Sequence, residues 1–152
     1  MREPTITETQ NFRRIVASMA EEELEAHMKS IRYPKETICL IITDLIKEKT
    51  EKSKNTSEQM ASKIKKLISI AAIDPDSVAD KKSNATLLML ASQKGKHHIV
   101  NALLQSNADA NKIDIKGQTA LFYAFEVKSA SYKILELLLQ YSMLTQQNAT
   151  LT

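Results

Sequence analysis

The adjacent pair His97-His98 is the strongest candidate for metal binding in this chain. Imidazole is a common zinc ligand, but a zinc site needs three or four ligands. Neighbouring residues on a helix point about 100° apart, so the two rings would not converge on one ion. No Cys and no third His stand nearby in the sequence. We therefore expect a solvated helix face at His97 and His98, and we predict no metal site.

Cys39 and His27 are residue types that can serve as a nucleophile and its general base. Cys39 stands among isoleucines, however, and a buried cysteine usually acts as an inert apolar residue. The carboxylate cluster of residues 21–25 has no partner ligands around it. It is typical of an exposed helix start, where the helix dipole favours acidic side chains. We predict no catalytic residues and expect no enzyme activity.

The lysines also fail to indicate a nucleic-acid or nucleotide site. The chain has no glycine-rich phosphate loop. Lysines at 47, 49, 52 and 54 alternate with Glu48 and Glu51, which is typical of a solvated linker. A strip of lysines at 63, 65, 66, 81 and 82 has no interleaved aromatic residues on which bases could stack. We predict no cofactor and no nucleic-acid partner.

Length and composition indicate a single helical unit. The chain has 152 residues, of which 43% are apolar, with 2 Gly and 3 Pro. So few turn-forming residues argue against a β-rich fold. The net charge of +3 is modest, and the single Cys39 excludes an internal disulfide. No apolar run approaches the ~20 residues of a membrane helix, and the amino terminus lacks the layout of a secretory signal.

The elements that would position any site are repeated. Residues 84–91 read Asn-Ala-Thr-Leu-Leu-Met-Leu-Ala, and residues 117–124 read Gly-Gln-Thr-Ala-Leu-Phe-Tyr-Ala. Thr86 and Thr119 stand 33 residues apart in these two copies, at the expected start of a helix. After the first copy, Gly95 suits a turn with positive φ, residues 99–104 form the apolar stripe of a second helix, and Asn107 suits a left-handed helix end. Such a unit buries its apolar face only by stacking on its neighbours.

These motifs resemble the ankyrin repeat family, whose period is 33 residues. The resemblance covers roughly residues 80–143. It implies an all-α ankyrin-repeat solenoid with an amino-terminal helical capping region. The copies depart from the usual Thr-Pro-Leu-His, reading Thr-Leu-Leu-Met at 86–89 and Thr-Ala-Leu-Phe at 119–122. The second copy also lacks the Gly between its helices, so residues 126–132 must bulge or extend a helix.

Four further helices are expected before the repeats. Apolar stripes lie at residues 12–19, 24–31, 38–46 and 60–71. Capping boxes are predicted at Ser18 with Glu21 and at Thr56 with Gln59, and Pro34 suits a first helical turn. Since about three repeats are needed for stability, we expect residues 34–72 to form an additional capping layer. The alternative is a separate helical subdomain that packs on the array.

The expected domain organisation has three parts. Residues 1–78 form the helical region, residues 79–145 form two ankyrin-like repeats, and residues 146–152 form a polar tail. The predicted core of the array consists of Leu88, Ala91, Ile99, Leu103, Leu121, Ala124, Leu135 and Leu138.

The resemblance implies a non-catalytic module that binds a partner protein through finger tips and first helices. The corresponding positions here are Lys82, Leu90, Gln93, Lys94, Ile113, Ile115, Lys116, Gln118, Tyr123, Glu126 and Val127. Tyr123 is the favoured hot spot because exposed Tyr is enriched in binding sites. Packing between adjacent fingers is an equally good interpretation of Ile113 and Ile115.

Two other functions stay open. One is a bacterial or viral effector that mimics a host ankyrin adaptor. The other is a targeting module for an activity in the amino-terminal helices. We expect a cytoplasmic protein, delivered into a host cell if it is an effector, with no membrane association.

Overall fold

The computed structural model describes residues 2–48, 57–126 and 132–151, with side chains through Met143. These residues form eight helices and one two-stranded antiparallel pair. The helices are α1 (Ile6–Ser18), α2 (Glu21–Ser30), α3 (Lys35–Lys47), α4 (Ser57–Ile70), α5 (Leu87–Gln93), α6 (His97–Gln105), α7 (Ala120–Glu126) and α8 (Tyr132–Leu151). The strands are β1 (Val78–Asp80) and β2 (Ala85–Thr86).

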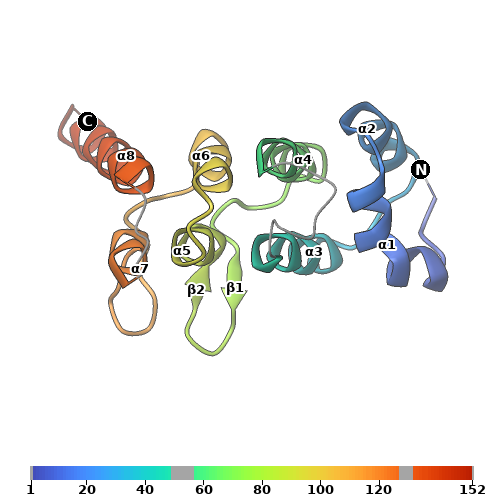
Figure 1. Cartoon of the computed structure of the whole chain (residues 1–152), viewed down its shortest axis with the longest axis horizontal. Coiled ribbons are helices and arrows are strands. Elements are labelled where there is room, and N and C mark those ends of the chain that lie inside the picture. The colour runs from blue at the N-terminus through green and yellow to red at the C-terminus, as the bar shows by residue number, and fades with distance from the viewer. Residues whose placement is uncertain (1, 49–56, 127–131, 152) are drawn as a thin grey trace.

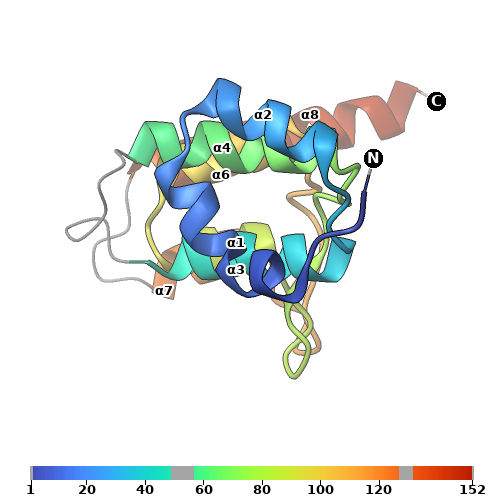
Figure 2. The ribbon, with the colours of Figure 1, turned by 90° about the vertical axis from the view of Figure 1, so that its right-hand side faces the viewer.

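The helices stack as a row of pairs (Figure 1). One row runs through α1, α3, α5 and α7, and the other runs through α2, α4, α6 and α8. Contacts join α4 to α6 and α5 to α7, so neighbouring pairs bury each other's apolar faces. Viewed along the row, the hairpin of β1 and β2 projects beyond the helices (Figure 2). This is the helical repeat array that the sequence predicts.

The predicted core residues are mostly inside. Leu88, Ala91, Ile99, Leu103, Ala124 and Leu138 are each at most 2% exposed. Leu121 and Leu135 are only partly buried against this core, which differs from the prediction. Both lie in the last helix pair, where no further layer covers them in the described part of the chain.

The backbone breaks predicted at Gly95 and Asn107 are confirmed, and Asn84 and Gly117 share their conformation. Asn84, Gly95, Asn107 and Gly117 all have positive φ, between 60° and 75°. At the end of α6 the amide of Ala108 donates to the carbonyl of Leu103 (3.0 Å), which is the bond of a helix end with a left-handed residue. The end of α4 repeats this geometry, with Ile73 N donating to Ile68 O (3.0 Å). There the left-handed residue is Ala72, with φ 50°, which the sequence did not indicate.

The helix starts in the amino-terminal region differ from the predictions. Ser18 is the last residue of α1, and its hydroxyl donates to the carbonyl of Ile15 rather than capping α2. Helix α2 begins after Ala20, whose amide donates to the carboxylate of Glu23. Pro34 is the residue just before α3, not its first turn. The predicted box at Thr56 lies outside the described residues.

Two lysines of α4 hold the first layers together. The buried Lys63 of α4 donates from Nζ to the carbonyls of Val16 and Ala17, at 3.0 and 3.3 Å. These carbonyls end α1, where the helix dipole favours a cation. Lys66 Nζ pairs with the Glu25 carboxylate of α2 at 2.7 Å. The two lysines therefore act as structural contacts, not as part of the basic strip considered from the sequence.

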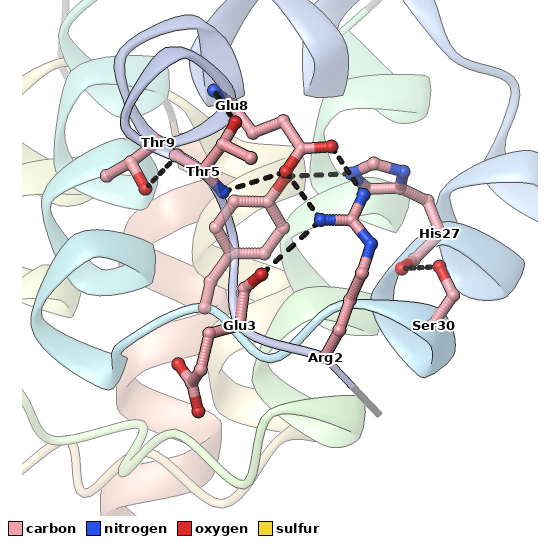
Figure 3. Close-up of polar contacts among 8 residues, drawn as sticks. Arg2, Glu3, Thr5, Glu8, Thr9, His27 and Ser30 are labelled. Carbon is pink, nitrogen blue, oxygen red and sulfur yellow. Dashed lines mark hydrogen bonds and ion pairs between the residues drawn. The ribbon is translucent and has the colours of Figure 1, made fainter.

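The amino-terminal segment is fixed by a polar cluster (Figure 3). The guanidinium of Arg2 donates to both carboxylate oxygens of Glu8, at 2.8 and 2.6 Å. Glu8 also accepts from the Thr5 amide, closing a capping box at the start of α1. The Arg2 hydrogen bonds and the Thr5 amide lower the pKa of Glu8 to about 2. The backbone of Arg2 pairs with Ser30 and Arg32, so this segment lies against the end of α2.

Candidate partner-binding groove

Two loops project from the first helices of the last two pairs. We call residues 74–86 the first finger and residues 109–119 the second finger. Each finger tip is held by one aspartate. Asp80 Oδ1 accepts from the Lys82 amide at 3.0 Å, and Asp114 Oδ1 accepts from the amides of Lys116 and Gln118, both at 2.9 Å. A short acidic side chain that bonds its own backbone two residues on is typical of such turns.

Direct hydrogen bonds join the two fingers. The amide of Asp109 donates to Asp76 Oδ1 at 2.7 Å. The amide of Ile115 donates to the carbonyl of Ser83 at 3.0 Å. Both donors belong to the second finger and both acceptors to the first, so the fingers form one continuous edge below α5 and α7.

Tyr123 is tied into the second finger. Its hydroxyl donates to Asp114 Oδ2 at 2.6 Å, and the ring is partly buried against the core. Burial, followed by the bond to Asp114, raises the pKa of Tyr123 to about 12. The sequence predicts an exposed tyrosine at this position, whereas the side chain is half-buried. Its hydroxyl is already engaged.

A groove of about 500 Å³ lies between the fingers and the first helices. We call it the finger groove. Residues from α5, α7 and both fingers line it together with the end of α3. Its lining includes seven residues that the sequence assigned to partner binding, namely Leu90, Gln93, Lys94, Lys116, Gln118, Tyr123 and Glu126.

The remaining predicted residues lie elsewhere. Lys82 is exposed at the tip of the first finger. Ile113 and Ile115 are 56% and 67% exposed on the second finger, so their side chains do not pack between the fingers. Val127 lies outside the described residues, as do residues 128–131 of the irregular segment.

The finger groove also contains residues that the sequence analysis did not select. Lys47, Asp80 and Ser83 line it. Asp80 and Ser83 lie in the first finger, within the residues 80–143 that the resemblance covers, but of this finger only Lys82 was predicted to contact a partner. Lys47 belongs to α3, a helix that lacks the Thr and Gly of the repeat motif. Its position beside the fingers results from the stacking of the helix pairs, so the sequence motif did not predict it.

The histidines considered above for metal binding and catalysis instead contact neighbouring rings of the protein. The rings of His97 and His98 lie 4.0 Å apart and are half-buried, not divergent and solvated as expected. Burial, His98 and Lys133 together lower the pKa of His97. Within residues 2–48, 57–126 and 132–151, no group of three or more His, Cys, Asp or Glu residues could hold a metal ion. His27 bonds the Tyr33 hydroxyl at 2.8 Å.

A family model of ankyrin repeats, in three copies, matches residues 53–149. The match covers more than half of the chain, so this protein belongs to the ankyrin repeat family. The matched range includes α4, which extends the resemblance found in the sequence towards the amino terminus. Comparisons with curated proteins and with solved structures gave no match.

Ankyrin repeats are generally protein–protein interaction modules and are typically non-catalytic. No catalytic domain is identified in the chain. In the part of the chain that the structure describes, no helix is long and apolar enough to cross a membrane.

Proposed function

We propose that the chain is a non-catalytic module that binds a partner protein in the finger groove. The observation that carries this proposal is the meeting of five separate segments in one concave surface. Leu90 and Tyr123 supply apolar area, and Gln93 and Gln118 supply amide groups around it. Most of the lining residues are polar, so such a site would select its partner through hydrogen bonds and charge as well as by covering apolar area.

Three lysines and two acidic residues, Asp80 and Glu126, line the finger groove, so its charges are mixed with a small positive excess. Lys47, Lys94 and Lys116 line it, and no ion pair engages them within the described residues. The nearby Asp114 carboxylate instead accepts two amides and the Tyr123 hydroxyl. Rim charges of this kind act mainly on association rate and specificity.

The test is affinity capture with a charge-reversed groove. The variant carries Lys94→Glu and Lys116→Glu, both at exposed positions. The matched control carries Arg14→Glu and Arg32→Glu, which make the same charge change at exposed residues outside the groove. We expect the wild type and the control to retain the same protein, with at least a tenfold loss of affinity for the groove variant, about 1.4 kcal/mol. Equal retention by both variants would contradict the proposal.

We also propose that α1–α4 cap the array. This is supported by the contacts of α3 with α5 and of α4 with α6, which lie over the apolar face of the first recognisable repeat. The Nζ of Lys96, which precedes α6, donates to the carbonyl of Glu48 at the end of α3. A separate subdomain would instead be expected to fold independently of the repeats, and a truncation described below separates the two arrangements.

A further inference from the structure

A second groove, of about 590 Å³, lies on the other side of the first finger. We call it the α3 groove. Its walls are the part of α3 from Lys35 to Thr43, the turn that follows α4, and the first finger around β1. Leu40 is 60% exposed and Val78 is 36% exposed at its walls. Such exposed apolar side chains on opposite walls of one groove indicate a surface that another chain can cover.

The α3 groove lies where a finger preceding α3 would be. The connections that carry the fingers into α5 and α7 span residues 71–86 and 106–119, whereas α2 and α3 are joined by Ile31–Pro34 alone. Helix α3 therefore has no finger of its own, and the outer face of the first finger is left without the neighbour that the second finger has.

The hydrogen bonds between the two fingers indicate which groups a neighbour of the first finger would have to offer on its outer face. In the second finger, the donors to the first finger are the amides of Asp109 and Ile115. Asp109 stands two residues after the left-handed Asn107, and Ile115 directly follows the tip residue Asp114.

The first finger has the same two donors. Asp74 stands two residues after the left-handed Ala72, and Lys81 directly follows the tip residue Asp80. Both residues line the α3 groove. Among the described residues, the amides of Asp74 and Lys81 have no hydrogen-bond acceptor. By the equivalence with the second finger, we expect these amides to face the α3 groove.

We propose that the α3 groove binds a finger-like loop of a partner protein. The loop would present a side-chain oxygen of Asp or Asn to the Asp74 amide and a backbone carbonyl to the Lys81 amide. It would also cover Leu40 and Val78 with an apolar side chain. The template is the first finger itself, which offers Asp76 Oδ1 and the Ser83 carbonyl to its neighbour. This site is separate from the finger groove, and Leu40 does not line the latter.

A second copy of this chain cannot supply the loop from its intact array. Each finger lies under its own helix pair, so inserting the second finger of another copy would place α7 and α8 where α3 and α4 already are (Figure 1). The occupant is therefore a loop that is not followed by a helix pair in the same layer.

The single cysteine of the chain reports on this groove. Cys39 lines the α3 groove and is half-buried. Burial raises the pKa of its thiol, so alkylation by iodoacetamide is measured at mildly alkaline pH. The probe is a cyclic hairpin peptide with the sequence of residues 74–86, which carries the two template acceptors. The rate of Cys39 alkylation is compared with and without this peptide, in the full chain.

We expect the peptide to slow alkylation saturably, at least threefold at about 1 mM, which corresponds to a weak complex. The protection should vanish in Leu40→Lys and persist in Phe125→Lys, which places the same substitution at an exposed residue outside the groove. A peptide with Asp76→Ala should lose at least tenfold in affinity. No protection of the wild type, equal protection of Leu40→Lys, or equal protection by the altered peptide would each overturn the proposal. Circular dichroism of both variants confirms that they remain folded.

Discussion

The left-handed residue at the end of α4 provides the sharpest test of the fold. Ala72 has φ 50° and is exposed, while Asn107 has φ 71° at the equivalent end of α6. A left-handed conformation costs an alanine about 1–2 kcal/mol. Glycine avoids this strain but loses more backbone freedom on folding, about 0.5–1 kcal/mol. We therefore expect Ala72→Gly to stabilise the protein by about 0.5–1 kcal/mol.

The reciprocal change and a matched control make this prediction specific. Asn107→Ala should destabilise by a similar amount, since it places alanine in the same strained conformation. Ala26→Gly is the control, because Ala26 is exposed inside α2 and glycine there should destabilise by about 0.5–1 kcal/mol. The same substitution thus has opposite signs at positions 26 and 72.

The measurement is urea unfolding followed by far-ultraviolet circular dichroism. Stability changes are read from the midpoint at an unchanged slope, since a changed slope would indicate a different denatured or native state. A loss of stability in Ala72→Gly comparable to that in Ala26→Gly would refute the reasoning. It would mean that α4 does not end in the same left-handed turn as α6.

Three further predictions concern the core, the capping region and the second finger. Leu103 is 0% exposed, and Leu103→Ala should lower the free energy of unfolding by roughly 2–5 kcal/mol in urea; a loss near zero would mean that the repeat register is wrong. A fragment starting at Asp80 should be unfolded or aggregated, and cooperative unfolding of that fragment by circular dichroism would contradict the capping proposal. Tyr123 has a pKa raised to about 12 from 10. Its neutral form is therefore favoured by folding, and the associated stability is present below pH 10 and lost as the pH rises to about 12. Tyr123→Phe should remove that part of the alkaline loss, which urea midpoints across this pH range measure against wild type.

The sequence by itself determined the repeat and its local geometry. A 33-residue spacing, the helix-start threonines and the breaks at Asn84, Gly95, Asn107 and Gly117 are short-range features. Backbone conformation at such positions depends on the residue type and its immediate neighbours, so the pattern alone predicts it. For the same reason, the apolar stripes correctly predicted most of the core.

Only the tertiary structure decided how separate segments meet. Position 72 is neither glycine nor asparagine, so the sequence did not indicate its left-handed conformation, which accompanies the bond from the Ile73 amide to the Ile68 carbonyl. Tyr123 has the same sequence context whether it is free or bonded to Asp114, and the fold of the second finger brings the two side chains together at 2.6 Å. Lys47 and Lys116 share the finger groove although 69 residues of chain separate them, because stacking of the layers sets that distance. Contacts between elements depend on packing over the whole array, and no local pattern encodes them.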